Sequence, residues 1–453
     1  MALCVIVALL AIGGPCLGAE LPRRPNIVFI LLDDLGWRDV GCYGNSFVQT
    51  PHIDRLAAGG MRFTRAYSQP VCSPTRAALM TGMHPVRTGI TDYLGPKDRK
   101  FLSPDLATLP KKLKESGYAT GLIGKWHLMG DYALRRGDPA RCGFDEVICS
   151  ETSYIGPGYY FHPYKHLAGL PRRLPDEYLT DRLNLEAVEF LRRRRQGPFF
   201  LYLSHYAVHT TLAARPALVE KYRKKPGAGE PAPAGPARNH RNNPILAAMM
   251  ESVDEGVGMI RRELASLGLD RNTLIVFLSD NGGEAVHSRG LGVTSVAPLR
   301  AGKSWLYEGG LRVPMIVLWP GVVRAGAVCD VPVNCLDLYP TFLEAAGARP
   351  DPDQPLDGVS LLPLLTQTGE PKRDAMYWHY PLAKPHFLGG RSAGAILVGD
   401  WKLLEFFDTG QRELYDLSRD AGEQHDLAAR MPDKTRDLAA RLQSWRTRTG
   451  ARY

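Results

Sequence analysis

Two pairs of oxygen-bearing side chains follow apolar runs that are typical of buried strands. Asp33 and Asp34 come directly after one run, and Asp280 and Asn281 come shortly after another. Converging carboxylates repel one another unless a cation neutralises them, and oxygen-only ligands select Ca²⁺ or Mg²⁺. The alternative is that each pair caps a helix or a turn, as Asp and Asn often do. Two matching pairs at two strand ends favour a divalent-metal site.

A cysteine opens a second candidate site at the start of a predicted helix. Ser73 is a good N-cap and Pro74 a good first helical residue, so we expect a helix over residues 74–81. Cys72 and Arg76 would then lie at the positive end of this helix, which is a ready anion site. A thiol there has a lowered pKa and can act as a nucleophile. The alternative is a buried cysteine beside an ordinary helix start.

Basic side chains follow two further apolar runs. One run leads into Lys125 and His127, and the other leads into His205, with His209 four residues later. Each of these residues alone would be interpreted as a solvated lysine or as a hydrogen-bonded structural histidine. Their shared position after strand ends indicates instead that they belong to one site.

Strand-like and helix-like patterns alternate through most of the chain. The apolar runs cover residues 26–32, 118–123, 199–203 and 273–278, and helical spacing covers residues 106–116, 180–195 and 245–267. Continuous apolar runs suit strands that are covered on both faces, as in a parallel sheet. The pattern therefore predicts an α/β fold with a large, mainly parallel sheet flanked by helices. Ligands of such sheets bind beyond the carboxyl ends of the strands.

The pattern changes after about residue 355. Short strands over residues 376–380, 395–398, 401–406 and 413–415, and a closing helix over residues 433–446, predict a smaller α+β domain with an antiparallel sheet. We therefore expect a catalytic domain over residues 24–355 and a C-terminal domain over residues 356–453. This second domain carries no cluster of catalytic residue types, so we expect it to pack against the first and to shape a pocket.

Composition and the amino terminus bound the class of protein. The 453 residues are 44% hydrophobic and 23% charged, which excludes a disordered or fibrous protein. The net charge of +9 favours anionic partners, and no nucleic-acid motif is present. The apolar run of residues 3–12 is too short for a membrane span and predicts a signal peptide over residues 1–19. We expect an exported protein without stable membrane insertion.

Six cysteines follow the predicted signal peptide, and their spacing matches no zinc pattern. Most are interpreted as buried apolar residues. In an oxidising compartment, Cys142 with Cys149 and Cys329 with Cys335 could each close a small loop, but spacing does not fix the connectivity.

Five ordered motifs resemble those of the formylglycine-dependent sulfatases. They are Asp33-Asp34, Cys72-x-Pro74-x-Arg76, the segment from Gly117 to His127, Asp280-Asn281-Gly282, and Lys303 followed by Glu308-Gly309-Gly310. The resemblance covers most of residues 25–345 and continues more weakly through the tail. The chain is similar to the arylsulfatases, whose family has the alkaline phosphatase superfamily fold.

The resemblance implies that Cys72 is converted to formylglycine (3-oxoalanine) by a formylglycine-generating enzyme. The hydrated aldehyde would attack the sulfur of a sulfate monoester with one hydroxyl and expel sulfate with the other. By the same resemblance, Ca²⁺ would be held by a set of residues at the strand ends together with the modified Cys72 side chain. That set is Asp33, Asp34, Asp280 and Asn281.

The resemblance also assigns roles to the basic residues. Arg76 would orient the hydrated aldehyde, and Lys125 and Lys303 would bind sulfate oxygens. His127 would act as the base for the second hydroxyl. His209 would lie by the leaving-group oxygen, with Lys303 as the candidate proton donor and His205 as a competitor for the place of His209. The Glu308-Gly309-Gly310 motif is expected to form a turn that supports Lys303.

These observations predict a sulfuric ester hydrolase that acts on a sulfated saccharide or an aryl sulfate. One alternative is a phosphate or phosphonate ester hydrolase on the same scaffold, because the two groups share tetrahedral oxygens. Another is a non-catalytic, glycan-binding relic in which Cys72 is unmodified. Specificity is expected in the loops over residues 149–164, 224–244 and 379–391.

Overall fold

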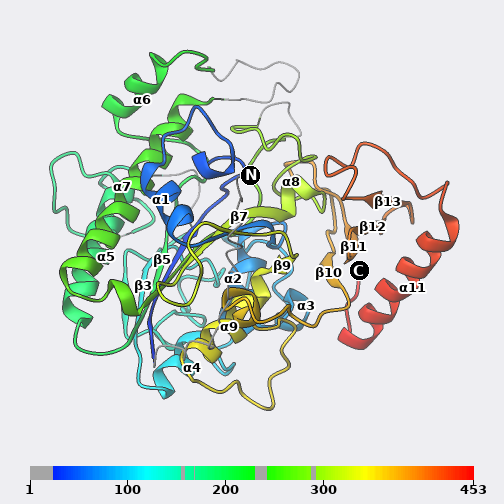
Figure 1. Cartoon of the computed structure of the whole chain (residues 1–453), viewed down its shortest axis with the longest axis horizontal. Helices are drawn as coiled ribbons and strands as arrows, with labels where there is room; N and C mark the ends of the chain where they lie inside the picture. The colour runs from blue at the N-terminus through cyan, green and yellow to red at the C-terminus, as the bar shows by residue number, and fades with distance from the viewer. Residues whose placement is uncertain (1–23, 155–158, 168, 230–241, 287–291) are drawn as a thin grey trace, which may run out of the picture.

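The computed structural model describes residues 24–154, 159–167, 169–229, 242–286 and 292–453. The predicted signal peptide therefore lies outside the described residues. Two sheets organise this part of the chain, one of nine strands and one of four. Figure 1 shows the larger sheet within a helical body and the smaller one beside it, near the C-terminus.

The larger sheet has its most buried strands at the centre. In spatial order its strands are β4 (Glu146–Ile148), β3 (Ala119–Gly124), β5 (Phe199–Ser204), β1 (Asn26–Leu32), β6 (Thr273–Ser279), β7 (Arg312–Leu318), β2 (Met61–Tyr67) and β8 (Ala327–Cys329), with β9 (Val333–Asn334) also pairing with β2. The block from β4 to β6 is parallel throughout, whereas β7 runs antiparallel to both β6 and β2. The predicted mainly parallel sheet is confirmed, and all four predicted apolar runs are adjacent strands of it.

Helices cover both faces of this sheet because successive side chains of a strand point to opposite faces. The first face packs against α1 (Pro51–Gly59), α5 (Leu179–Arg194), α6 (Pro216–Arg223) and α7 (Pro244–Ser266), and the second against α2 (Cys72–Thr81), α4 (Leu109–Glu115), α9 (Leu338–Ala345) and α10 (Leu362–Leu365). In β1, Val28 and Ile30 face the first layer, and Ile27 and Phe29 face the second. The predicted three-layer α/β arrangement is the observed one (Figure 1).

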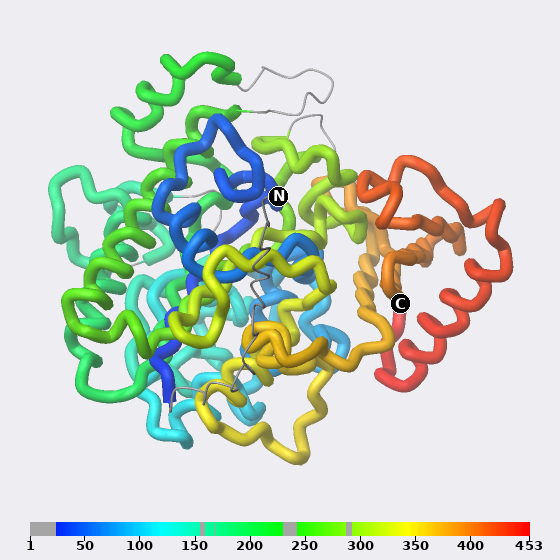
Figure 2. The backbone as a smooth tube through the Cα atoms, in the orientation of Figure 1, coloured from blue at the N-terminus to red at the C-terminus, as the bar shows by residue number. Residues whose placement is uncertain are grey.

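The smaller sheet is antiparallel, as predicted, and it joins the larger body through one face. Its strands are β10 (Met376–Tyr380), β11 (Ala393–Val398), β12 (Trp401–Phe406) and β13 (Arg412–Asp416), and the closing helix is α11 (Pro432–Thr449). One face packs with residues around Tyr67 and Leu311, and the other packs against α11. Figure 2 shows this segment, in orange and red, as a lobe beside the main body.

Two local expectations were wrong. Helix α2 begins at Cys72 rather than at Pro74, because Val71 is the extended N-cap and the Ser73 hydroxyl donates a hydrogen bond to the His127 carbonyl at 2.8 Å. The Glu308-Gly309-Gly310 motif is helical and forms α8 (Glu308–Leu311), not a turn. The remaining short elements are α3 (Pro85–Thr88) and 3₁₀ helices over Gly41–Tyr43, Asp270–Asn272 and Cys335–Asp337.

The six described cysteines are free, so neither of the possible loop-closing pairs is bonded. Five of them are buried, in agreement with their interpretation as apolar residues. Within the described ranges, no helix combines the length and the apolar character that a membrane crossing requires.

Candidate active site

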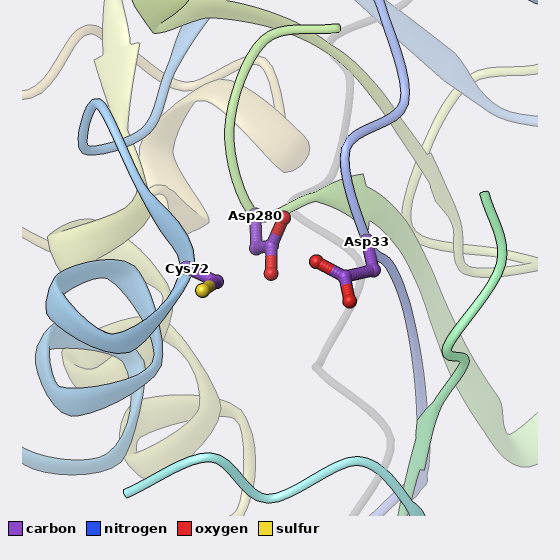
Figure 3. A group of neighbouring side chains, drawn as sticks. All are labelled: Asp33, Cys72 and Asp280. Carbon is purple, nitrogen blue, oxygen red and sulfur yellow. The ribbon is translucent and has the colours of Figure 1, made fainter. Parts of the chain in front are cut away.

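Three side chains from separate elements converge at the carboxyl ends of the central strands. Asp33 follows β1, Asp280 follows β6, and Cys72 opens α2; one ligand atom from each lies within 4.8 Å of the others. All three are buried. Figure 3 shows the two carboxylates and the thiol pointing into the space between them. The sequence separates these residues by up to 247 positions, and the parallel sheet brings them together.

The donor atoms of this cluster fit a hard divalent cation. Asp33 Oδ1 and Asn281 Oδ1 are buried and have no hydrogen-bond partner within the described residues. Burial, together with the negative charge of Asp33, raises the pKa of Asp280 well above its usual range. Two buried carboxylates with an unsatisfied oxygen between strand ends are stabilised by added positive charge, and oxygen donors favour Ca²⁺ or Mg²⁺.

Asp34 and Asn281 lie at the edge of this cluster. The backbone N–H of Asp34 donates to Asp280 Oδ1 at 3.1 Å, and Asn281 Nδ2 donates to Asp34 Oδ1 at 2.8 Å. Asp34 has a φ of 63°, so the backbone turns sharply just after β1 and directs two consecutive carboxylates into the site. Both predicted oxygen pairs therefore meet in one place.

Arg76 connects three strand ends from its position on α2. Its Nε and Nη2 donate to Asp280 Oδ2 at 3.0 and 2.7 Å. Its Nη1 donates to the Lys125 carbonyl at 3.0 Å and to Ser204 Oγ at 2.6 Å. The guanidinium is fully buried, so all of these charge-assisted bonds form away from bulk water. Arg76 thus fixes the position of α2 and Cys72 relative to the ends of β3, β5 and β6.

His127 faces the thiol directly. Its Nδ1 lies 3.2 Å from Cys72 Sγ, and its Nε2 lies 3.0 Å from the Leu94 carbonyl oxygen. Because a carbonyl only accepts, Nε2 carries the proton and Nδ1 presents its lone pair to Cys72. Burial and the charge of Lys125 lower the pKa of His127 to about 3, so the ring is neutral near pH 7. A neutral imidazole with a free Nδ1 can accept a proton at this position.

A carboxylate holds the turn that carries His127. Glu151 accepts hydrogen bonds from the backbone N–H groups of Trp126, at 2.9 Å, and of His127 itself. The φ of His127 is 53°, in the left-handed region that non-glycine residues seldom occupy. Glu151 stabilises this strained turn and was not predicted as a site residue from the sequence.

Two buried lysines pair with the acidic residues. Lys125 Nζ pairs with Asp33, and Lys303 Nζ lies 2.6 Å from Asp34 Oδ2. Burial alone would lower the pKa of each lysine, but the adjacent carboxylate raises it, so both ammonium groups stay charged. Two fixed cations that line the same cavity as Cys72 can bind the oxygens of a tetrahedral anion.

These residues open onto a cavity of about 330 Å³. Its lining includes Cys72, Lys125, His127, His209 and Lys303, together with Tyr93, Tyr154, Thr210, Thr211, His386 and Phe387. His209 Nε2 lies 3.8 Å from Asp34 Oδ2, and burial followed by the charge of Lys303 lowers the pKa of His209 to about 4. His205 is fully buried and does not line the cavity, so the geometry favours His209 over its competitor.

The aromatic side of the cavity was only partly foreseen. Tyr154 comes from the predicted specificity loop over residues 149–164, and His386 and Phe387 come from the one over residues 379–391. The described residues of the third predicted loop, 224–229 and 242–244, do not line this cavity. Tyr93 was missed, because it follows no strand and belongs to no motif. Its ring meets that of His386 edge-on, with centroids 5.6 Å apart.

Comparison with known proteins gives consistent matches along the chain. Residues 25–348 match the family model described as Sulfatase, and residues 301–448 match the one described as N-sulphoglucosamine sulphohydrolase, C-terminal. The N-acetylgalactosamine-6-sulfatase of Rattus norvegicus is 32% identical over 412 residues, which cover 85% of this chain and 72% of the relative. The steryl-sulfatase of Homo sapiens is 30% identical over 439 residues, covering 79% and 72%.

A solved structure is similar over almost the whole chain. The crystal structure of Ps i-CgsB superposes with a TM-score of 0.80, at 33% identity and with 93% of each chain covered. The same protein has been solved in complex with k-i-k-neocarrahexaose.

Proposed function

Because this chain belongs to the sulfatase family and is therefore a sulfuric ester hydrolase, we propose that it removes sulfate from sulfated carbohydrates. It would do so with a formylglycine formed from Cys72 and with a bound Ca²⁺. One observation carries this proposal. The thiol, a neutral histidine and two charged lysines line a single cavity, and two buried carboxylates lie next to the thiol.

Asp33, Asp280 and the side-chain Oδ1 of Asn281 would hold the Ca²⁺, with Asp34 and the modified Cys72 side chain completing the set. When bound, the ion supplies positive charge next to a sulfate oxygen, and the formylglycine hydrate supplies the nucleophilic hydroxyl. The unpaired oxygens of Asp33 and Asn281 support this assignment.

The remaining residues would bind the substrate and move protons. Lys125 and Lys303 bind sulfate oxygens, and Arg76 keeps the nucleophile in place through its bonds to Asp280. The Cys72 Sγ stands where the modified side chain would carry its hydroxyl groups. His127 Nδ1, 3.2 Å from that atom, accepts the proton that is released there.

The proton for the leaving group needs a charged donor. His209 is neutral near pH 7 because its pKa is lowered to about 4, whereas Lys303 stays protonated beside Asp34. Lys303 is therefore the proposed donor to the leaving oxygen. Because the neutral His209 donates from Nδ1 to the Thr210 carbonyl at 2.6 Å, its Nε2 would accept a hydrogen bond from the leaving hydroxyl once that group is protonated.

The cavity suits a sugar better than a flat steroid. Its wall combines charged groups with the rings of Tyr93, Tyr154 and Phe387, and sugar rings present both hydroxyls and apolar faces. Relatives named for galactosamine sulfate and a similar structure solved with an oligosaccharide support this choice. The net charge of +9 agrees with a polyanionic substrate.

Three further parts of the proposal concern the modification of the chain, its export and its division into domains. A formylglycine-generating enzyme would modify Cys72, and the protein would be exported after cleavage of residues 1–19. The catalytic domain would span residues 24–355, and the C-terminal domain residues 356–453. The separate family match over residues 301–448 supports a distinct C-terminal unit.

The test is a desulfation screen across defined sulfated sugars, an aryl sulfate and the matching aryl phosphate, with Ca²⁺ present and chelated. Sulfate release that requires Ca²⁺ is the expected result. Faster release of phosphate would favour the phosphate ester hydrolase. Mass spectrometry of the peptide with Cys72 completes the test, because an intact, alkylatable thiol in native protein would favour the non-catalytic relic.

A further inference from the structure

Two chain segments leave the catalytic cavity and run side by side. One continues from Tyr93 and the other from His127, both of which line the cavity. Phe101 and Met129 then pair in an antiparallel bridge, and the N–H of Leu102 donates to the Leu128 carbonyl at 2.8 Å. Residues a few positions beyond each cavity residue are therefore held next to one another.

A second hollow, of about 310 Å³, lies along these two segments. It is lined by Arg99, Phe101, Asp131, Leu134 and Arg136, and it shares no lining residue with the catalytic cavity. Phe101 and the exposed Leu134 give it apolar surface, and the two arginines enter it from different segments. We call it the Arg99–Arg136 hollow.

Its two arginines form no ion pairs within the described residues, and they outnumber the single carboxylate of the hollow. Neither Arg99 nor Arg136 forms an ion pair with a carboxylate of the described residues, whereas Arg135 pairs with Asp138. The one carboxylate of the hollow, Asp131, uses Oδ1 to accept the backbone N–H groups of Ala133 and Leu134, each at 3.1 Å. Two guanidinium groups thus face this hollow with a single acidic group that is engaged elsewhere.

Surface arginines without partners are common, and alone they would be interpreted as solvated. Here they combine with concave shape, apolar surface and a direct chain connection to the catalytic cavity. A guanidinium presents a planar fork that binds sulfate or carboxylate oxygens in pairs. Because the segments that connect the two hollows are bonded to one another at Phe101 and Met129, an extended polyanion with one sulfate in the catalytic cavity could place a neighbouring anionic group at this hollow.

We propose that the Arg99–Arg136 hollow is a second anion subsite, which binds a sulfate or carboxylate group on a neighbouring sugar of the same substrate chain. This inference rests on the proposed function. It implies that the enzyme acts on oligosaccharides carrying more than one negative charge in preference to monosulfated sugars.

The test compares two substrates in the Arg99→Gln/Arg136→Gln double variant. One is an oligosaccharide with two or more sulfates, and the other is an aryl sulfate, which is too short to reach the hollow. We expect KM for the oligosaccharide to rise about tenfold, so that the ratio of its kcat/KM to that of the aryl sulfate falls by the same factor. The salt dependence of KM for the oligosaccharide should also weaken.

A matched control keeps the charge change the same. Arg55 and Arg262 also lack ion pairs with described carboxylates, and they line a different hollow beside the start of β6, at the opposite end of that strand from the catalytic cluster. In the Arg55→Gln/Arg262→Gln variant, the ratio of kcat/KM for the oligosaccharide to kcat/KM for the aryl sulfate should be the same as in the protein without substitutions. An equal change in both double variants would overturn the subsite, since it would reflect net charge alone.

The outcomes separate the two proposals. If the protein without these substitutions hydrolyses neither substrate, the proposed function fails. If it hydrolyses both and the Arg99→Gln/Arg136→Gln ratio is unchanged, the subsite fails and the function stands. Oligosaccharides whose second anionic group is either a sulfate or a uronic carboxylate then identify the group that the hollow binds, through the larger rise in KM.

Discussion

The protein contains two buried clusters of charge, and only one of them adjoins the cavity. In the catalytic cluster, Asp33 and Asn281 each keep a buried oxygen without a partner. In the second cluster, Lys402 Nζ lies 2.9 Å from both Glu308 Oε1 and Glu423 Oε1, and all three side chains are buried. The first cluster opens onto a cavity, and the second is enclosed between the two sheets.

The enclosed cluster pairs its carboxylates with a cation inside the fold, although among the described residues Glu423 Oε1 makes only the ion pair with Lys402 and no hydrogen bond. Glu308 also accepts a hydrogen bond from Tyr67 at 2.9 Å, and the Glu308 N–H donates to Glu423 Oε2 at 2.6 Å. Lys402 belongs to β12 in the smaller sheet, and Glu308 opens α8 beside the larger one. The comparison shows how similar residue types serve different ends, since an incomplete cluster can accept a ligand and a complete one joins two parts of a fold.

The largest expected effect comes from removing the nucleophile. Cys72→Ala should lower kcat by at least about 10³-fold, because no other described group in the cavity can form the same intermediate. Unfolding should change little, since alanine fits the start of α2. Initial rates on an aryl sulfate measure the loss. Cys142→Ala, which removes another buried free thiol, serves as the control and should remain active.

The enclosed cluster should respond in stability instead. Lys402→Met leaves two buried glutamates without their partner and should lower the free energy of unfolding by about 3–5 kcal/mol. Urea denaturation measures this change. Lys372→Met, the same substitution at an exposed lysine, should alter stability by about 0.5 kcal/mol or less. Equal stability of the two variants would show that the cluster does not join the sheets.

Calcium should stabilise one cluster and not the other. At a hundred times its Kd, Ca²⁺ should add about 2.7 kcal/mol to the stability of the folded protein, and a chelator should remove both this gain and activity. Thermal unfolding with and without Ca²⁺ checks the prediction. Asp33→Asn should lose the Ca²⁺-dependent rise in Tm. Asp39→Asn, at a buried carboxylate bonded to Thr294, should keep it.

The most gradual expected effect is a pH dependence of the enclosed cluster. Burial raises the pKa of Glu423 from 4.5 to about 7, so the folded protein binds a proton there that the unfolded chain releases at lower pH. The stabilisation is complete below pH 4.5 and is lost as the pH rises towards 7. In Tm measurements over this range, Glu423→Gln should reduce the slope. An unchanged slope would assign it to other groups.

The sequence predicted the parts of the site that follow strands. Asp33, Lys125 and Asp280 come directly after continuous apolar runs, and a parallel sheet places the ends of such strands together. The order of the motifs then identified Cys72 and Arg76. The start of helix α2 was predicted two residues too late. Ser73 has the residue type of an N-cap, but its hydroxyl bonds the His127 carbonyl, a tertiary contact that the local sequence does not reveal.

Contacts between distant segments could not be predicted. Lys402 and Glu308 are 94 residues apart, and no spacing or periodicity connects them. The same holds for Tyr93 and His386, whose rings meet only after the smaller sheet has packed against the larger body. The tail carries no cluster of catalytic residue types, but it was expected to shape the pocket, and its loop over residues 379–391 contributes His386 and Phe387 to the wall of the cavity.

The two sides of the cavity are synthesised at different times. Domains fold as the chain emerges, with the N-terminal part first. The central strands that carry Asp33 and Asp280 can assemble early, but the residues around His386 are among the last quarter to be made. A ribosome-bound chain would therefore contain the carboxylates of the site before the His386 side of the cavity wall is made. Substrate selectivity, to the extent that it depends on this wall, would be established last.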